Sequence, residues 1–379
     1  MSTLFKIIHL ILVISFSMAA CKEMDDNYQQ YVVPDGITYP GKANHAVLHP
    51  GRERVLITWP AGADPSVVKA HVYWNNYSDS IVLDIPSGTD TVRCHIDPLP
   101  EGSYSFIIHT FDTKGNISIP VELNGFVYGE LYQSSISQRL VKDFSLDLGS
   151  GKYLISWNDA DITNGAWSTE VKYKNLNGTD IVLIKEATKD TTLISDIDLY
   201  EPFFYRTMYM PDSVSIDAFY TDYLEYTIDE IALPKDRMKI LAFSSQHSGT
   251  ANQASNILDG NNTGTRWHTN ASGGNFPHFI TIDFGGVAPL TRITVWSSLV
   301  DRPANSPDPR HPKQFKIETS QDNETWTEIA TYDFRNVLEQ DILIPLTYAR
   351  YIRLTGEQPS SYNGTTNIMA LGELSFYCK

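Results

Sequence analysis

The stretch DGNNTGTRWHT, residues 259–269, places one carboxylate, two amides, three threonine hydroxyls and an imidazole close together in the chain. Hard oxygens of this kind are the ligands that Ca²⁺ prefers, and Gly260 and Gly264 would let the backbone wrap tightly around an ion. The same groups could instead contact a polar ligand or hydrogen-bond to the backbone amides of a turn. These alternatives stay open at this point, and the surrounding elements must decide between them.

The N-terminus carries an export signal. Lys6 precedes the apolar run IIHLILVISF, which is too short to cross a bilayer as a permanent helix and is typical of a signal peptide. The run ends at SMAAC, which resembles a bacterial lipobox, so we expect cleavage of residues 1–20 and lipidation of Cys21. An ordinary secretory cleavage that leaves Cys21 unmodified is the alternative.

Acidic residues follow Cys21 directly in the segment KEMDD. This segment is similar to the signal that sends lipoproteins of the Bacteroidota to the outer face of the outer membrane, although a solvated acidic linker would have the same composition. We therefore expect a lipid-anchored protein that faces the cell exterior. Residues 21–35 are polar and are predicted to form a flexible tether.

The composition is that of a globular protein with an uneven charge. Hydrophobic residues make up 42% of the chain, which excludes a largely disordered protein, and the length is sufficient for two or three domains. The net charge is −16, but the part from Lys235 onward contains 13 basic and 14 acidic residues. Because no part of the chain is strongly basic, nucleic acid is not an expected partner.

Short alternating or apolar runs between turn clusters predict β-strands nearly throughout the chain. In the first third, such runs extend from RVLITW (54–59) to SYSFIIHTF (103–111). Their spacing predicts a fibronectin III- or immunoglobulin-like β-sandwich over residues 36–128. Tyr104 follows a Pro/Gly corner, where its hydroxyl could hydrogen-bond back to the preceding loop as in a tyrosine corner.

The strand pattern is repeated about 98 residues later. VLITW (55–59) corresponds to YLISW (153–157), and VYW (72–74) corresponds to VKY (171–173). We predict a second, more divergent sandwich over residues 129–233, with chance similarity between β-rich stretches as the alternative.

The first sandwich also resembles a known family. GITYPGK (36–42), VYWNN (72–76) and LPEGSYSFIIHTFDTKGNIS (99–118) are similar to domain of unknown function 4998 of Bacteroidota surface lipoproteins. This resemblance covers roughly residues 30–150. It implies partners among the outer-membrane components for glycan uptake, without any known chemistry.

The C-terminal segment, residues 235–379, carries a further resemblance. In order, it contains ASNILDGNNTGTRWHT, FITIDFGG, LTRITVW, PKQFKIETSQDNETWTEIA, ARYIRLTG and LGELSFY. These motifs are similar to the discoidin or coagulation-factor 5/8 type C fold and, within it, to family 32 carbohydrate-binding modules. The prediction for the chain is therefore an all-β fold: two fibronectin III/immunoglobulin-like β-sandwiches followed by a discoidin-type jelly-roll β-sandwich.

The discoidin resemblance implies a structural calcium ion. It assigns Asp259 and Thr265 of the opening stretch to the ion, together with Glu373 of the final strand. Asn262, and either Ala254 or Asn256, could add main-chain oxygens. The ion would pin the loop to that strand and take no part in chemistry. A metal-free turn capped by Asp259 is the alternative.

The same resemblance implies a polysaccharide or other glycan as ligand. A glycan site needs an aromatic ring that stacks on the apolar face of a sugar, and polar groups that hydrogen-bond its hydroxyls. Arg302 lies near the position of the family's ligand-reading arginine and Tyr362 near that of its stacking aromatic residue, with His268, Asn305 and Asn363 as further candidates. The loop after Arg302 departs from the usual arginine-to-asparagine spacing of the family, and each residue could equally be a solvated loop residue.

We expect three polar loops to form this site: HTNASGGN (268–275), LVDRPANSPDPRHP (299–312) and EQPSSYNGTTN (357–367).

Catalytic motifs are not found in the sequence. It contains no GxSxG, HExxH or phosphate-binding glycine loop, and three sandwiches would occupy nearly the whole chain. We therefore expect a non-catalytic surface lipoprotein that captures glycans and assists their uptake. A structural or adhesin subunit that binds a protein or host glycoprotein is one alternative, and a glycoside hydrolase of unrecognised type is another.

Overall fold

The computed structural model describes residues 36–270, 275–362 and 367–379. The predicted lipidation site Cys21 and the candidate Asn363 lie outside these residues. The chain forms two compact units, which we describe separately. Unit 1 comprises Met1–Ser134 with Asp212–Ala218, and unit 2 comprises Ser135–Pro211 with Phe219–Lys379.

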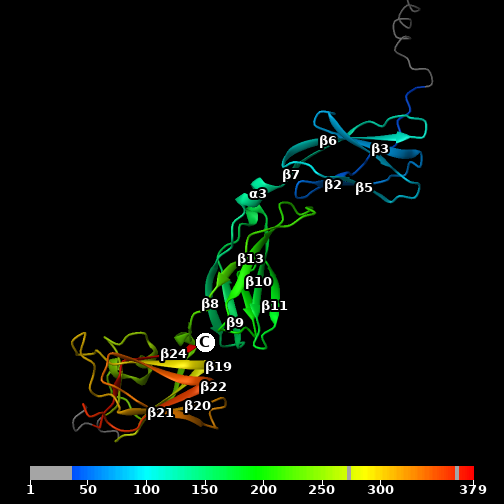
Figure 1. Cartoon of the computed structure of the whole chain (residues 1–379). Coiled ribbons are helices and arrows are strands. Elements are labelled where there is room, and N and C mark those ends of the chain that lie inside the picture. The colour runs from blue at the N-terminus through cyan, green and yellow to red at the C-terminus, as the bar shows by residue number, and fades with distance from the viewer. Residues whose placement is uncertain (1–35, 271–274, 363–366) are drawn as a thin grey trace, which may run out of the picture. The chain divides into compact units, whose positions relative to one another are not determined.

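Unit 1 contains the first sandwich (Figure 1). One antiparallel sheet has the strand order β1-β2-β5 and the other has the order β4-β3-β6-β7. The strands are β1 (Val47–Pro50), β2 (Val55–Pro60), β3 (Val67–Trp74), β4 (Asp79–Asp84), β5 (Thr91–Ile96), β6 (Gly102–Asp112) and β7 (Val121–Val127). The short helix α3 (Glu130–Ser135) follows β7.

Alternation along the strands builds the core of the first sandwich. In β2, the side chains of Val55, Ile57 and Trp59 are buried while their neighbours are more exposed, because successive side chains of a strand point to opposite faces. The hydroxyl of Tyr104 donates to the carbonyl oxygen of Pro100 at 2.9 Å. The predicted tyrosine corner is therefore confirmed.

Unit 2 begins with the second sandwich. Its sheets have the orders β12-β9-β8 and β11-β10-β13-β14, with β15 paired to β13. The elements are β8 (Val141–Asp147), β9 (Lys152–Trp157), the 3₁₀ helix η1 (Ile162–Asn164), β10 (Ala166–Lys174), β11 (Asp180–Glu186), β12 (Thr191–Ile194), β13 (Phe203–Tyr209), β14 (Phe219–Tyr220) and β15 (Leu224–Tyr226).

The repeated sequence motifs occupy equivalent strands in the two sandwiches. Strands β2 and β9 are each the middle strand of the smaller sheet, and β3 and β10 each lie beside an edge strand, β4 or β11. Trp59 and Trp157, at corresponding positions of β2 and β9, are both buried. The sequence similarity therefore reflects a repeated strand arrangement.

The third sandwich completes unit 2. Its large sheet has the order β16-β24-β19-β22-β20-β21, with β17 paired to β19, and a small sheet pairs β18 with β23. The strands are β16 (Ile231–Ala232), β17 (Lys239–Phe243), β18 (Trp267–His268), β19 (His278–Trp296), β20 (Gln314–Ser320), β21 (Thr327–Asp333), β22 (Glu339–Gly356), β23 (Ala370–Leu371) and β24 (Glu373–Cys378). The 3₁₀ helices η2 (Lys235–Arg237), η3 (Thr250–Asn252) and η4 (Ala254–Leu258) lie between its first strands. The predicted all-β fold is confirmed.

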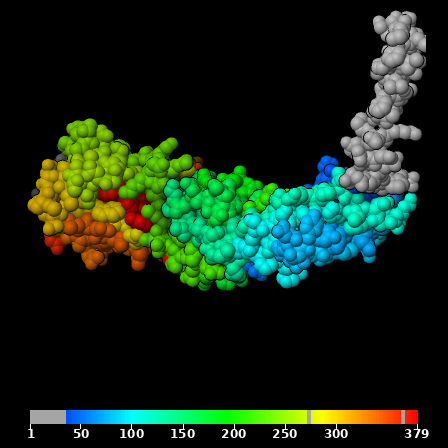
Figure 2. All heavy atoms as spheres, turned by 90° about the horizontal axis from the view of Figure 1, so that it is seen from above, coloured from blue at the N-terminus to red at the C-terminus, as the bar shows by residue number. Residues whose placement is uncertain are grey.

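The two sandwiches of unit 2 share one continuous apolar core. A Cβ atom placed on Gly286 of β19 would lie 1.7 Å from the carbonyl oxygen of Leu148, which follows β8. The backbones therefore approach so closely that only glycine fits at this point. In the space-filling view, little of the red C-terminal segment reaches the visible surface of unit 2 (Figure 2). Among the described residues, no helix is long and apolar enough to span a membrane.

Candidate functional site

The described residues of the three polar loops predicted to carry the site lie next to one another in the third sandwich. The backbone N–H of Thr269 donates to the carbonyl oxygen of Met369 at 2.9 Å, which joins the first loop to the chain after the third. The hydroxyl of Ser360 donates to the carbonyl oxygen of Pro309 at 2.8 Å, which joins the second loop to the third. Residues far apart in the sequence are thus brought together at one place.

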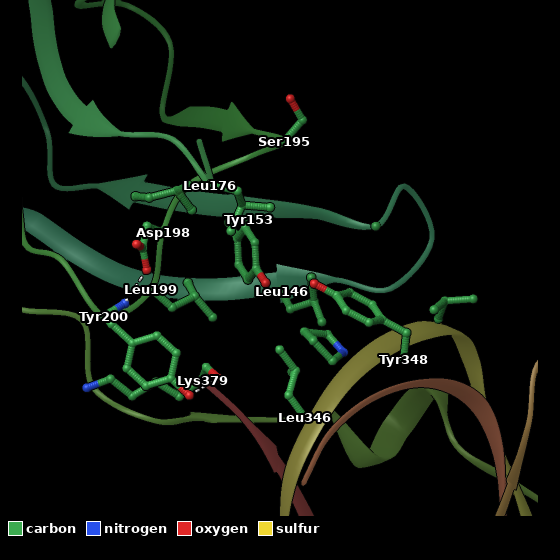
Figure 3. Close-up of a pocket in the computed structure, with 14 residues that line it drawn as sticks. Leu146, Tyr153, Leu176, Ser195, Asp198, Leu199, Tyr200, Leu346, Tyr348 and Lys379 are labelled. Carbon is green, nitrogen blue, oxygen red and sulfur yellow. Dashed lines mark hydrogen bonds between the residues drawn. The ribbon is translucent and has the colours of Figure 1, made fainter. Parts of the chain in front are cut away.

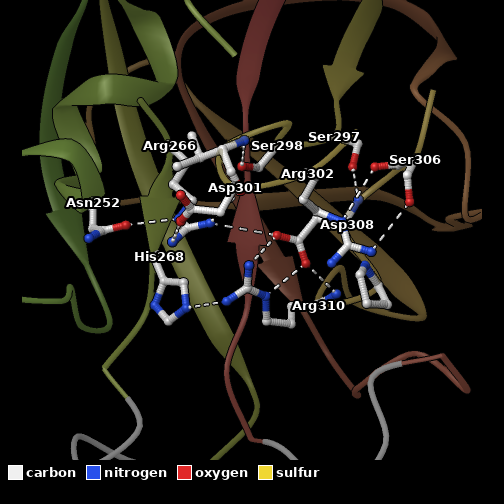
Figure 4. Close-up of polar contacts among 12 residues, drawn as sticks. Asn252, Arg266, His268, Ser297, Ser298, Asp301, Arg302, Ser306, Asp308 and Arg310 are labelled. Carbon is white, nitrogen blue, oxygen red and sulfur yellow. Dashed lines mark hydrogen bonds and ion pairs between the residues drawn. The ribbon is translucent and has the colours of Figure 1, made fainter. Parts of the chain in front are cut away.

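A buried carboxylate, Asp308, is the centre of the second loop (Figure 4). Its side chain has no exposed surface, and Arg310 donates to both of its oxygens, with an Nε–Oδ1 distance of 2.8 Å. A second arginine, Arg266, lies 3.9 Å from the same carboxylate. Because an unpaired buried charge is costly, the two guanidinium groups compensate the burial of this carboxylate.

Arg266 connects this carboxylate to the segment before β18. Its side chain is 9% exposed, its Nε donates to Asn252 Oδ1 at 2.8 Å, and its Nη1 donates to the Val300 carbonyl oxygen at 3.2 Å. Burial, together with the positive charge of Arg310, lowers the pKa of Arg266. Asp301, which lies 3.7 Å away, opposes this effect.

His268 is buried and holds Arg310. The ring Nδ1 lies 2.8 Å from the carbonyl oxygen of Thr269, and Nε2 lies 3.0 Å from Nη1 of Arg310. A carbonyl can only accept, so Nδ1 carries the proton and Nε2 accepts from Arg310. Burial, reinforced by the charge of Arg310, lowers the pKa of His268 to about 4. The neutral imidazole of His268 therefore positions Arg310. The direct contact of His268 with a ligand stays a prediction.

Arg302, Tyr362 and Asn305 are the described candidates that remain available to a ligand. The contacts of Arg302 to Ser306 are long, at 3.4 and 3.5 Å, and within the described residues no carboxylate pairs with it. Tyr362 is 63% exposed, and its ring centroid lies 6.3 Å from that of His311. Asn305 is exposed on the same loop as Arg302.

This arrangement combines a fixed interior with open hydrogen-bonding groups. The paired charges of Asp308, Arg310 and Arg266 stabilise the second loop. Arg302 keeps guanidinium donors free for acceptors of a ligand, and the ring of Tyr362 offers an apolar face. Sequence reasoning missed the interior residues, because their types suit a solvated loop equally well and only their burial shows their role.

The stretch 259–269 is hydrogen-bonded to the final strand, β24, as the calcium prediction requires. The hydroxyl of Thr265 lies 2.7 Å from Asp259 Oδ2 and 2.8 Å from the carbonyl oxygen of Asn261. Glu373 is buried, and its Oε2 accepts from the backbone N–H of Gly260 at 2.8 Å. A carboxylate, a hydroxyl and a carbonyl thus gather beside a second carboxylate, and this donor set fits Ca²⁺.

Two features of this stretch differ from the expected ligand set. The carbonyl of Asn262 accepts from the backbone N–H of Leu299 at 2.7 Å, so it is engaged with the next loop. Lys235 donates to Glu373 Oε1 at 2.6 Å and supplies a positive charge of its own. Burial raises the pKa of Glu373, while the ion pair with Lys235 opposes that shift.

The described residues contain no group of three or more His, Cys, Asp and Glu side chains that could hold a metal.

The third sandwich belongs to a known class of domain: residues 240–371 match the model of the F5/8 type C domain. Similar solved structures include the family 32 carbohydrate-binding module of Clostridium perfringens NanJ in complex with galactose, with 20% identity, 39% of this chain and 99% of that chain covered, and a TM-score of 0.33. The C-terminal domain of a chitobiase from Bacteroides fragilis is similar with 27% identity, 38% and 95% coverage, and a TM-score of 0.32. Chitosan-binding module 1 of a chitosanase/glucanase from Paenibacillus sp. IK-5 has 23% identity, 37% and 95% coverage, and a TM-score of 0.30.

The chain as a whole belongs to the DUF4998 family, a domain of unknown function, whose model matches residues 21–219. The match extends beyond the resemblance over residues 30–150, because it includes most of the divergent second sandwich. No curated protein matches the chain.

The stability of the protein should depend on pH through His268. The unfolded chain takes up a proton below the ordinary histidine pKa of about 6.5, whereas folded His268 does so only near pH 4. Stability should therefore be complete above pH 6.5 and fall by about 3 kcal/mol as the pH decreases to 4. Urea unfolding followed by tryptophan fluorescence at a series of pH values measures this loss.

His268→Gln should show a shallower pH dependence over the same range, while His45→Gln, at an exposed position of unit 1, should behave as the wild type. Equal pH dependence for the wild type and His268→Gln would contradict the assignment.

Proposed function

We propose that this protein is a non-catalytic cell-surface lipoprotein whose third sandwich binds a glycan and so assists capture and uptake by partner proteins in the outer membrane. The observation that carries this proposal is the pair of available groups, Arg302 and Tyr362, on adjoining polar loops of an F5/8 type C sandwich. A sugar ring has an apolar face and a rim of hydroxyls. The exposed ring of Tyr362 suits the face, and the guanidinium of Arg302 suits the rim.

The interior of the loops supports the same proposal. Binding is weakened when loops must be ordered on association. The second loop is already held by the buried pair of Asp308 and Arg310, and the first is held to it by His268. The part of the site around Arg302 is therefore held in place before a glycan binds.

Glycan binding should be visible in affinity electrophoresis of the full chain through gels that contain plant, mucin or host polysaccharides. We expect one glycan class to retard the protein. Arg302→Ala and Tyr362→Ala should each weaken binding by about tenfold, because each removes a hydrogen-bonding or stacking contact. Arg335→Ala and Tyr77→Ala are matched controls at exposed positions outside the polar loops and should bind as the wild type.

A folded protein that no glycan retards would contradict the proposal. It would favour the structural or adhesin alternative, in which the same loops bind a protein or a host glycoprotein. Release of reducing ends from a retarding glycan would contradict the non-catalytic part.

We further propose that Ca²⁺ binds to the oxygens of Asp259, Thr265 and Glu373, with the carbonyl oxygen of Asn261 as an additional ligand. The ion would neutralise the two carboxylates and tie the loop to β24. Lys235 already pairs with one oxygen of Glu373, so the ion would share that carboxylate with an ammonium group.

Calcium should raise the melting temperature of the full chain, and a chelator should lower it. At a hundredfold excess over the dissociation constant, the gain in stability should be about 3 kcal/mol. Asp259→Asn should abolish the difference in melting temperature between calcium and chelator. Asp322→Asn, at an exposed turn, should preserve this difference. Identical melting curves in calcium and chelator would mean that the Lys235–Glu373 pair closes the loop without a metal.

We also propose that acyl chains on Cys21 anchor the protein to the outer membrane. Cys21→Ala should abolish incorporation of labelled palmitate and transfer the protein to the soluble fraction, because the anchor is the acylated thiol. Protease added to intact cells should degrade the wild-type protein if it faces the exterior. Membrane association that survives Cys21→Ala would exclude this anchor.

A further inference from the structure

A pocket of about 260 Å³ opens where the second and third sandwiches of unit 2 meet (Figure 3). None of its residues belongs to the three polar loops. Tyrosines from both sandwiches line it: Tyr153 of β9, Tyr200 before β13 and Tyr348 of β22. Aliphatic side chains form most of the remaining wall: Leu146, Leu176, Ile197, Leu199, Val287, Pro289 and Leu346.

The rings of Tyr200 and Tyr348 stand on opposite sides of the pocket, with Tyr153 between them (Figure 3). Tyr200 is 70% exposed and Tyr348 is 53% exposed. The hydroxyl of Tyr200 donates to the carbonyl oxygen of Lys379 at 3.1 Å, which fixes the orientation of that ring. Two exposed aromatic rings thus line the pocket, and that of Tyr200 is fixed by a hydrogen bond.

Hydrogen-bonding groups lie among these apolar surfaces. Tyr153 is 9% exposed, yet within the described residues its hydroxyl forms no hydrogen bond. Burial raises the pKa of Tyr153, so the phenol remains a protonated donor. Asp198 accepts from the backbone N–H of Tyr200 through Oδ1 at 3.0 Å, which leaves Oδ2 free. Tyr348 also lines the pocket, with its hydroxyl directed towards Tyr153 (Figure 3).

We propose that this pocket is a second saccharide site, which binds a single ring of a neutral glycan between Tyr200 and Tyr348. The volume lies just below the range of about 300–1,000 Å³ that is usual for drug-sized ligands, so it suits one ring and not an extended chain. A purely apolar ligand would leave the hydroxyl of Tyr153 and Oδ2 of Asp198 without a hydrogen bond, which is costly. A pyranose offers both an apolar face for the rings and hydroxyls for the polar groups.

The test uses the full chain with Arg302→Ala and Tyr362→Ala combined, a background in which the loop site is disabled. Isothermal titration calorimetry would use galactose, N-acetylgalactosamine, glucose, N-acetylglucosamine, mannose and xylose as probes. We expect the background to retain one weak site for at least one of these sugars.

Two substitutions of pocket residues are combined, one at a time, with Arg302→Ala and Tyr362→Ala. Tyr348→Ala should weaken the remaining binding by about tenfold, because it removes a stacking face. Tyr153→Phe keeps the buried ring, and hence the fold, and should weaken binding by about fivefold through loss of one hydrogen bond. Tyr77→Ala, an exposed tyrosine of unit 1, should leave the affinity unchanged.

The proposal is overturned if the background binds none of the sugars, or if its binding survives both Tyr348→Ala and Tyr153→Phe. These outcomes are distinct from failure of the proposed function. Glycan binding by the wild type that vanishes in the background would support the loop site alone. Equal binding by the wild type and the background, lost in Tyr348→Ala, would support the pocket alone.

Discussion

The carboxylate of Asp308 is the constraint on which the polar loops of the third sandwich depend. It has no exposed surface, and because an unpaired buried charge is costly, its contacts with Arg310 and Arg266 are what stabilise it there. Arg310 lies two residues away on the same loop, whereas Arg266 belongs to the segment before β18, and each arginine is tied to a further residue, His268 or Asn252. Through these contacts the network joins the second loop to segments that are distant in sequence.

The residues that stabilise the loops are different from those proposed to contact the ligand. The charged groups of the network neutralise one another in the interior and have few hydrogen bonds left to offer a ligand. Arg302 and Tyr362 lie on the same loops but hold only weak contacts of their own. Substitutions in the interior should therefore alter the loops as a whole, whereas substitutions at these two positions act on individual contacts. The specificity of the site can then change without loss of the fold.

Much of the fold could be predicted from the sequence, because strand periodicity is local. The repeated strands, the corner at Tyr104 and the closure of the loop at Asp259 against Glu373 all follow from local patterns or from motifs in order. The interior of the site could not be predicted in this way. Asp308 and Arg310 are two residues apart in a polar loop, and only the packing of other segments shows that one is buried. Whether the carbonyl of Asn261 or that of Asn262 is available as a calcium ligand depends on the backbone conformation of one turn. A sequence motif does not show that conformation.

The join between the second and third sandwiches limits how unit 2 can be divided into fragments. Strand β16 precedes the F5/8 type C match, yet it pairs with β24, with Ile231 opposite Cys378. The backbone at Leu148 of the second sandwich also packs closely against Gly286 of the third. A fragment that contains only the matched residues would lack β24 as well as β16 and would expose apolar surface normally covered by the neighbouring sandwich. The third sandwich of this protein should therefore be separated from the rest of the chain together with the second.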